Sequence, residues 1–340
     1  MRLTRSKLNS AGIIRKRRGK GFAYYGPDGE LLADDDTAQR IKDLVIPPAW
    51  KNVWISPTPS GHIQAVGTDV AGRRQYLYHE RWQQERAEEK FDRVLELSTR
   101  LPEWRAQVSK DLSARGLTRD RVLALALQLL DRGYFRAGGE QSAEEFEHYG
   151  LATLLCEHVT LRKGVVAFEY PAKSGVQRSI EIEDPEVVRA VKSLMRRNGG
   201  SDRLLVCRGG ADGAWVDVRA DDLNARFKEL VGEEFTVKDL RTWHGTVLAA
   251  AAFASAKEPT SPTRIKKETS AVMKEVSGEL GNTPAVARAS YVDPRVVDGY
   301  AKGMTISSAV KRAEKAADPN ESQAVLEKAT RTLIRRVART

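Results

Sequence analysis

Apolar residues in about the first ninety positions occur in short runs separated by turn residues. Gly, Pro, Asp and Ser stand between these runs, which cover 22–25, 53–56, 63–66 and 75–78. Short apolar runs with this punctuation are typical of strands in an antiparallel sheet. One helix is predicted among them, over 36–43.

The rest of the chain has mainly helical spacing. In 82–97, apolar residues recur three and four positions apart, and Pro102 is expected in the first turn of the next helix. Thr118 is a predicted N-cap for the strongly apolar segment 122–130. Further helical patterns cover 184–197, 221–231, 238–255, 266–279 and 321–338.

A β-hairpin is predicted to interrupt these helices. The runs 159–161 and 165–170 flank Lys163-Gly164, and 173–175 is a predicted turn before a third strand over 177–182.

Together these patterns predict an α+β fold with two domains, because 340 residues are too many for one typical core. The expected parts are a small, antiparallel, β-rich N-terminal domain over 1–87 and a larger, mainly α-helical domain over 88–340.

The charge of the chain favours a polyanionic partner. The formal net charge is +10, and nucleic acid is the commonest partner of so basic a protein. Residues 1–20 hold eight Lys or Arg and no acid, and 331–339 add four arginines. Both ends could lie along phosphates; the alternative is a pair of solvated tails.

The composition is that of a soluble, folded protein, with 41% apolar and 30% charged residues. No apolar run is long enough to span a bilayer, and the basic N-terminus lacks the apolar stretch of a signal peptide. We therefore expect a cytoplasmic protein without membrane contact.

Cysteine and histidine spacing gives no indication of a metal site. Cys156 and Cys207 are far apart and are expected to be buried or half-buried thiols, and the five histidines have no ligand spacing. No metal is expected.

Five groups of short motifs follow one another along the chain. They are IPPAWKNVW at 46–54 with GTD at 67–69 and GRRQYLY at 72–78; RAG at 136–138 with YGLATL at 149–154 and HV at 158–159; YPAKSG at 170–175; KDLRTW at 238–243; and GNTP at 281–284 with ASYVDP at 289–294. Each motif alone is unspecific. In this order, over nearly the whole chain, they resemble the poxvirus-like, bacterial type IB DNA topoisomerases.

The resemblance implies catalytic roles for five residues. Tyr291 matches the nucleophile that becomes linked to a DNA 3′ phosphate. Arg136 and Arg241 match the arginines that hold the scissile phosphate, a task that suits an always-charged, planar guanidinium. Lys173 matches the lysine that protonates the departing 5′ oxygen. Asn282 stands where many relatives have His, and its amide can donate a hydrogen bond but cannot transfer a proton.

A second set of residues is predicted to contact DNA. Tyr76 and Tyr78 alternate as on one face of a strand, and Arg73 and Arg74 precede them. The alternative is that the two tyrosines form a packed face of the sheet. Lys238, at the start of a predicted helix, is also expected at the DNA.

The resemblance further implies an activity and a partner. A family member relaxes positive and negative supercoils through a transient single-strand break, a 3′-phosphotyrosyl intermediate, strand rotation and religation. It does so without ATP, metal or another cofactor. We expect a monomer that closes as a C-shaped clamp on double-stranded DNA.

Two other functions remain open at this point. A tyrosine site-specific recombinase shares the Arg, Lys, Arg and Tyr chemistry, but it usually has His where this chain has Lys238, and it lacks the motif at 46–54. A non-enzymatic DNA-binding protein would have the same basic charge. Each residue also has an ordinary alternative; Arg241, for example, could simply pair with Asp239.

Overall fold

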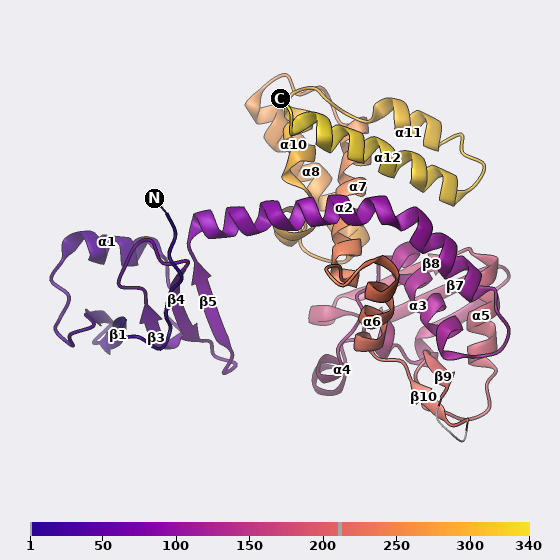
Figure 1. Ribbon diagram of the computed structural model, residues 1–340, viewed down its shortest axis with the longest axis horizontal. Helices are drawn as coiled ribbons and strands as arrows, with labels where there is room; N and C mark the ends of the chain where they lie inside the picture. Colours follow the sequence, from indigo (N-terminus) through magenta and orange to yellow (C-terminus); the bar gives the residue numbers. More distant parts are fainter. Residues whose placement is uncertain (1, 210–212) are drawn as a thin grey trace. The chain divides into compact units, whose positions relative to one another are not determined.

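The computed structural model describes residues 2–209 and 213–340. The chain divides into two compact units, Met1–Phe91 and Asp92–Thr340. Figure 1 shows a sheet in the first unit and mostly helices in the second. The predicted α+β class is confirmed. None of the helices among the described residues is both long and apolar enough to cross a membrane.

The first unit is built on an antiparallel sheet with strand order β2-β1-β3-β4-β5. Its core contains Ile13, Val53, Ile55 and Ala65 of the sheet, together with Ile41 of the helix. The predicted strands and the predicted helix in this unit are confirmed. Their bounds are β1 Ile13–Arg18, β2 Gly21–Tyr25, α1 Asp35–Asp43, β3 Lys51–Ile55, β4 Ile63–Thr68 and β5 Arg74–Tyr78.

Strand β1 changes the interpretation of the basic N-terminal segment. Arg15 is buried, and its guanidinium donates hydrogen bonds to the carbonyls of Ile46, Pro47 and Trp50 at 3.3, 3.1 and 2.7 Å. The expectation that 1–20 lies along phosphates is therefore wrong for Arg15, because its donors fix the turn before β3.

Helix α2, Glu80–Leu112, runs through Pro102, so the prediction that Pro102 opens a new helix is wrong. Proline removes the N–H that would bond the carbonyl of Ser98. Arg331 satisfies that carbonyl instead, with its Nη1 2.8 Å away. Leu101 and Trp104 on either side are fully buried, and their packing offsets the cost of the proline, about 3 kcal/mol.

The second unit is mainly helical and contains the predicted hairpin as a three-stranded sheet, order β6-β7-β8. The predicted helices are confirmed, and Thr118 caps α3 by accepting from the Arg121 N–H. Cys207 is buried and Cys156 half-buried, as expected. The bounds are α3 Arg119–Gly133, α4 Glu140–Phe146, β6 Val159–Arg162, β7 Val165–Pro171, β8 Gln177–Ile182, α5 Pro185–Met195, β9 Val206–Arg208, β10 Trp215–Asp217, α6 Ala220–Val231, α7 Val237–Ser255, α8 Pro262–Leu280, α9 Pro284–Val286, a π-helical turn Ala287–Tyr291, α10 Pro294–Ala301, α11 Ser307–Ala313 and α12 Pro319–Val337.

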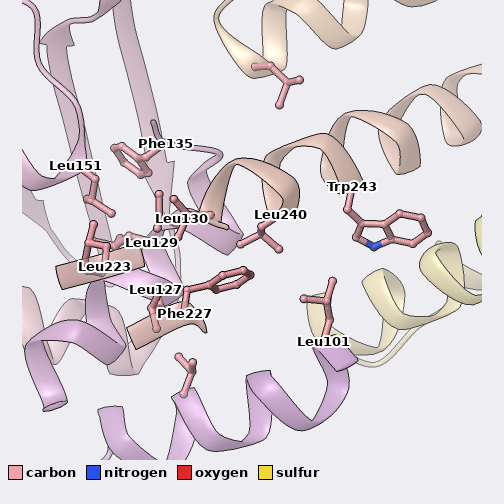
Figure 2. Packing of buried hydrophobic residues seen from close by; sticks show 14 of the residues in the cluster. Leu101, Leu127, Leu129, Leu130, Phe135, Leu151, Leu223, Phe227, Leu240 and Trp243 are labelled. Atoms are coloured by element: carbon pink, nitrogen blue, oxygen red, sulfur yellow. The ribbon is translucent and has the colours of Figure 1, made fainter. Parts of the chain in front are cut away.

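Helices α3 and α7 form the centre of this unit. Figure 2 shows Leu127 and Leu130 of α3 with Phe227 of α6 and Leu240 and Trp243 of α7 in one apolar cluster. Each fully buried side chain of this kind stabilises the fold by about 1.5–3 kcal/mol relative to exposure. The packing matters for the site because α3 ends just before Arg136 and α7 carries Arg241.

A buried charge network also joins the two central helices. Asp131 of α3 accepts from Arg105 at 2.7 and 3.0 Å and lies 2.9 Å from the Nε2 of His244 on α7. Arg105 also binds Glu327 of α12. The nearby Arg105 cation holds the pKa of Asp131 well below its usual range, despite the opposing effect of burial. The carboxylate therefore stays ionised and ties α3, α7 and α12 together.

Candidate active site

Arg136 lies in a rigid segment after the end of α3. Tyr134 ends the helix in the left-handed conformation, and Phe135 is buried against Phe168 and Tyr170 of the hairpin. The carbonyl of Arg136 accepts from the N–H of Leu151 at 2.8 Å. These contacts leave the guanidinium half-buried, with its Nη2 2.8 Å from the carbonyl of Gly281.

Arg241 is buried in the first turns of α7. Its guanidinium donates to the carbonyl of Tyr134 and to that of Leu280, at the end of α8. The alternative pairing with Asp239 is wrong, because that carboxylate accepts from Arg93 at 2.9 Å and from the backbone N–H of Thr236. Arg136 and Arg241 therefore meet at the end of α8.

Burial lowers the pKa of both arginines but leaves them protonated at neutral pH. Burial and the nearby Arg136 cation lower the pKa of Arg241 to about 10. Burial likewise lowers the pKa of Arg136. At neutral pH both guanidiniums remain positively charged, so the site presents two cations to an incoming anion.

Asn282 follows the glycine that ends α8. Its backbone N–H bonds the carbonyl of Ser277 at 2.9 Å, and Gly281 has the left-handed φ of 58° that such a helix end requires. Its side-chain Oδ1 and Nδ2 are both buried and have no hydrogen-bond partner among the described residues. Buried amides are nearly always hydrogen-bonded, so this amide is available to form a hydrogen bond with a bound ligand.

Tyr291 ends the π-helical turn, an element that often marks functional sites. It is half-buried, and the Cζ atom of Arg241 lies 5.3 Å from the centre of its ring. The tyrosine carbonyl accepts from the Thr246 hydroxyl at 3.3 Å, and that hydroxyl accepts from the N–H of Asp293 at 3.1 Å. Helix α7 thus carries both an arginine and the residue that holds the backbone of Tyr291.

Gly245 gives Tyr291 room to approach α7. A Cβ atom at this position would lie 2.6 Å from the carbonyl oxygen and 3.0 Å from the Cβ of Tyr291. Only glycine therefore fits this contact without a shift of the π-helical turn.

Two of the predicted residues lie at the surface. Lys173 is exposed at the connection between β7 and β8, where Ser174 and Gly175 have φ values of 65° and 71°. Lys238 is exposed in the first turn of α7. Within 2–209 and 213–340, neither ammonium group has a hydrogen bond or ion pair, so the structure does not join Lys173 to the arginines and Tyr291.

A further arginine of the cluster was missed in the sequence. Arg178 of β8 donates to the carbonyls of Gly278 and Glu279 at 2.9 and 2.8 Å. The only sequence signal for Arg178 was its position on the same strand face as Ile180 and Ile182. A charged side chain on an apolar face needs a hydrogen-bond or ion-pair partner.

The predicted DNA-contact residues of the first unit lie on strand β5 or, for Arg73, directly before it. Tyr76 and Tyr78 are 38% and 39% exposed, and their rings stack with centroids 6.0 Å apart, so they are not a packed face of the sheet. The Cζ of Arg74 lies 5.7 Å from the Tyr76 ring. Arg73 instead pairs with Asp69 at 3.1 Å and is 73% exposed.

Among the described residues, no group of three or more His, Cys, Asp or Glu could hold a metal ion.

Comparison with known proteins identifies the family. The model of the eukaryotic DNA topoisomerase I catalytic core matches residues 79–317, and that of the bacterial DNA topoisomerase IB N-terminal domain matches 21–69. DNA topoisomerase 1B of Acanthamoeba polyphaga mimivirus is 33% identical over 287 residues, 83% of this chain and 85% of the viral protein. DNA topoisomerase 1 of Daucus carota is 28% identical over 162 residues, 47% of this chain and 19% of the plant protein.

The resemblance seen in the motifs is thus confirmed, and both matched models describe topoisomerases rather than recombinases. The chain belongs to the type IB DNA topoisomerase family.

Proposed function

We propose that this topoisomerase cuts one strand of duplex DNA with Tyr291, while Arg136 and Arg241 hold the scissile phosphate. The observation that carries the proposal is that Arg241 lies against the ring of Tyr291 while both arginines reach the same helix end. Two fixed cations beside a phenol suit attack on a phosphodiester.

The reaction conserves the number of phosphate ester bonds. The Tyr291 hydroxyl loses its proton to solvent as its oxygen attacks phosphorus, and a bond from phosphorus to tyrosine replaces the bond from phosphorus to the 5′ oxygen. Negative charge develops on the non-bridging oxygens, where guanidinium donors stabilise it. Because the phosphotyrosine retains the bond energy, the 5′ hydroxyl can attack it in return and reseal the strand without ATP.

Lys173 is the proposed proton donor to the departing 5′ oxygen. Its ammonium is exposed at a narrow hairpin connection that can enter a DNA groove, and no carboxylate among the described residues pairs with it. A positioned general acid of this kind typically accelerates a reaction by about 10²–10⁴-fold. Arg136 is a candidate to share this proton transfer.

Asn282 is proposed to donate a hydrogen bond from Nδ2 to a non-bridging phosphate oxygen. The support is its buried amide, which has no partner among residues 2–209 and 213–340 and follows the residue whose carbonyl Arg136 binds. An amide can stabilise the charge that develops on this oxygen in the transition state, but it moves no proton.

DNA contacts outside the cut site are proposed for Tyr76, Tyr78, Arg73, Arg74 and Lys238. The exposed tyrosines offer flat faces and polar tips, and the cations offer charge to phosphates. After cleavage, the downstream duplex rotates about the intact strand, so positive and negative supercoils both relax. We expect the protein to act as a monomer on DNA in the cytoplasm.

The proposal is tested by relaxing supercoiled plasmid in EDTA without ATP, with the wild type and Tyr291→Phe. We expect the wild type to give a ladder of topoisomers from positively and negatively supercoiled DNA. Tyr291→Phe should relax neither and form no protein–DNA adduct after denaturation by detergent, while it retains DNA binding. Relaxation by Tyr291→Phe at the normal rate would show that another group is the nucleophile.

A further inference from the structure

Three arginines, from strand β8, helix α7 and the segment after α3, bind the carbonyls at the end of α8. A helix end leaves its last carbonyls without partners inside the helix and carries partial negative charge. Arg178 binds the carbonyls of Gly278 and Glu279. Arg241 binds that of Leu280, and Arg136 binds that of Gly281.

Arg178 differs from the other two because it comes from the hairpin that carries Lys173. It lies on β8 opposite Tyr170 of β7, three residues after Gly175 of the connection. Its side chain is half-buried, whereas its neighbours Gln177 and Ser179 are exposed. The side chain therefore points to the protein rather than to solvent.

The contact between Arg178 and α8 is close. A Cβ atom on Gly281 would lie 2.8 Å from the Cδ of Arg178, so the side chain passes directly over the residue before Asn282. The Arg178 cation also helps to lower the pKa of Arg136 and Arg241, in addition to the larger effect of their burial. The three guanidiniums therefore lie close enough to repel one another, and the shared helix end opposes that repulsion.

Tyr170 provides the second attachment of the same hairpin. Its ring stacks on Phe135, immediately before Arg136, with centroids 5.9 Å apart. The base of the connection is thus held at one strand by an aromatic contact to the Arg136 segment. At the other strand it is held by two hydrogen bonds to the α8 end.

We propose that Arg178 is a positioning residue that fixes the Lys173 hairpin to the end of α8 and thereby places Lys173 for proton transfer. The inference rests on the proposed role of Lys173 as the general acid. Without Arg178, the hairpin keeps its strands but loses its attachment beside Asn282. The lysine then spends less time within reach of the 5′ oxygen. Displacement of a catalytic group by about 1 Å can cost a factor near 100 in rate.

The test compares two leaving groups in single-turnover cleavage. One duplex carries the natural phosphodiester at a cleavage site mapped with the wild type, and the other has sulfur in place of the bridging 5′ oxygen. A thiolate leaves without a proton, so it makes a general acid unnecessary, while the demands on Tyr291 and the arginines remain. A defect in proton transfer is therefore restored by sulfur, and a defect in phosphate binding or folding is not.

We expect Lys173→Ala to cleave the natural duplex at least about 100-fold more slowly, in line with general-acid catalysis, and to approach the wild-type rate with sulfur. Arg178→Ala should be slower by about tenfold or more on the natural duplex, with the same restoration. The cleavage rate of Arg178→Lys, which keeps a cation at this position, should lie between those of Arg178→Ala and the wild type.

Arg162→Ala is the matched control, because Arg162 is an exposed hairpin arginine that pairs with Glu181 at 2.8 Å. It should cleave both duplexes like the wild type.

The outcomes separate this inference from the function on which it rests. If sulfur restores Lys173→Ala but not Arg178→Ala, Arg178 does not act through the lysine and the inference is wrong. A wild-type rate for Arg178→Ala on the natural duplex would overturn it as well. If sulfur fails to restore Lys173→Ala, the role of Lys173 falls and the inference falls with it. Should Arg178→Ala fold poorly, Arg178→Gln supplies the same comparison of duplexes.

Discussion

At the scale of single residues, Asn282 is the least expected member of the site. Its amide is buried and has no hydrogen-bond partner in the part of the chain that the structure describes, at an energetic cost that hydrogen bonding to protein would normally remove. A residue kept for stability would not carry this cost. We interpret the unpaired amide as a group reserved for the phosphate.

This interpretation predicts opposite effects of Asn282→Ala on stability and on catalysis. Removing one hydrogen-bond donor to developing charge typically costs about 10²–10³-fold, so single-turnover cleavage should slow by that order. The melting temperature should stay the same or rise, because the substitution removes an unsatisfied buried group. Asn282→His, which restores a donor, should recover most of the cleavage rate.

Rapid cleavage of mapped DNA by Asn282→Ala would exclude the amide from the transition state. A lower melting temperature together with slow cleavage would instead indicate a structural role. Thermal unfolding and single-turnover cleavage, measured on the same preparations, distinguish these results.

Sequence motifs identified the residues of the candidate site but not how they meet. The order of the motifs was enough to select Arg136, Arg241 and Tyr291, and these converge in the structure. Arg178 could not be found in this way, because its partners are backbone carbonyls about a hundred positions away and have no residue signature. Arg15 was misplaced for the same reason.

At the scale of elements, α7 connects the phosphate-binding and nucleophilic parts of the site. One turn after Arg241, Gly245 and Thr246 hold the backbone of Tyr291. The distance between the arginine and the nucleophile is thus set within one buried helix, whose position the α3 packing and the Asp131–His244 contact maintain.

Substitution of Gly245 by alanine should therefore impair cleavage although alanine favours helix. Alanine stabilises a helix interior by about 1 kcal/mol relative to glycine, but here its Cβ would lie 2.6 Å from the Tyr291 carbonyl oxygen. The π-helical turn must shift, and we expect cleavage to slow by about tenfold or more with unchanged DNA binding. Thr246→Val should also slow cleavage. Its matched control is Thr332→Val, which also removes a hydroxyl bonded to the carbonyl four residues earlier. Wild-type cleavage by both Gly245→Ala and Thr246→Val would show that α7 does not set the position of Tyr291.

Most long helices were predictable, whereas strand β1 and several short elements were not. Helices α7, α8 and α12 have many periods over which the apolar pattern repeats, and the hairpin has clear turns. Strands β9 and β10 have three residues each, too few for any pattern. The continuity of α2 through Pro102 depends on Arg331, more than two hundred positions away, which no local rule can include.

At the scale of the whole molecule, one family model matches 21–69, within the first compact unit, and the other matches 79–317, mostly within the second. The expected boundary was at 87/88, whereas the compact units divide between Phe91 and Asp92. Both positions lie inside α2, and a helix that continues across a boundary carries no break in its pattern. The sequence pattern therefore indicates two parts without a local signal for the boundary between them.

The net charge of +10 and the exposed residues of strand β5 lead to a prediction about how DNA affinity depends on salt concentration. Binding driven by phosphate contacts releases counterions, so the logarithm of affinity falls linearly with the logarithm of salt concentration. Arg74→Ala should reduce the magnitude of that slope by about 1, because one phosphate contact is lost. Tyr76→Ala should weaken binding at every salt concentration and leave the slope unchanged, since a tyrosine releases no counterion.

Arg189→Ala, which removes an arginine already paired with Glu186 on α5, is the control and should change neither the affinity nor the slope. The measurement is a titration of labelled duplex at several salt concentrations with Tyr291→Phe as the background, so that cleavage does not interfere. If Arg74→Ala and Tyr76→Ala both bind like the background protein, β5 lies away from the DNA, and the contacts of the N-terminal unit must come from another of its faces.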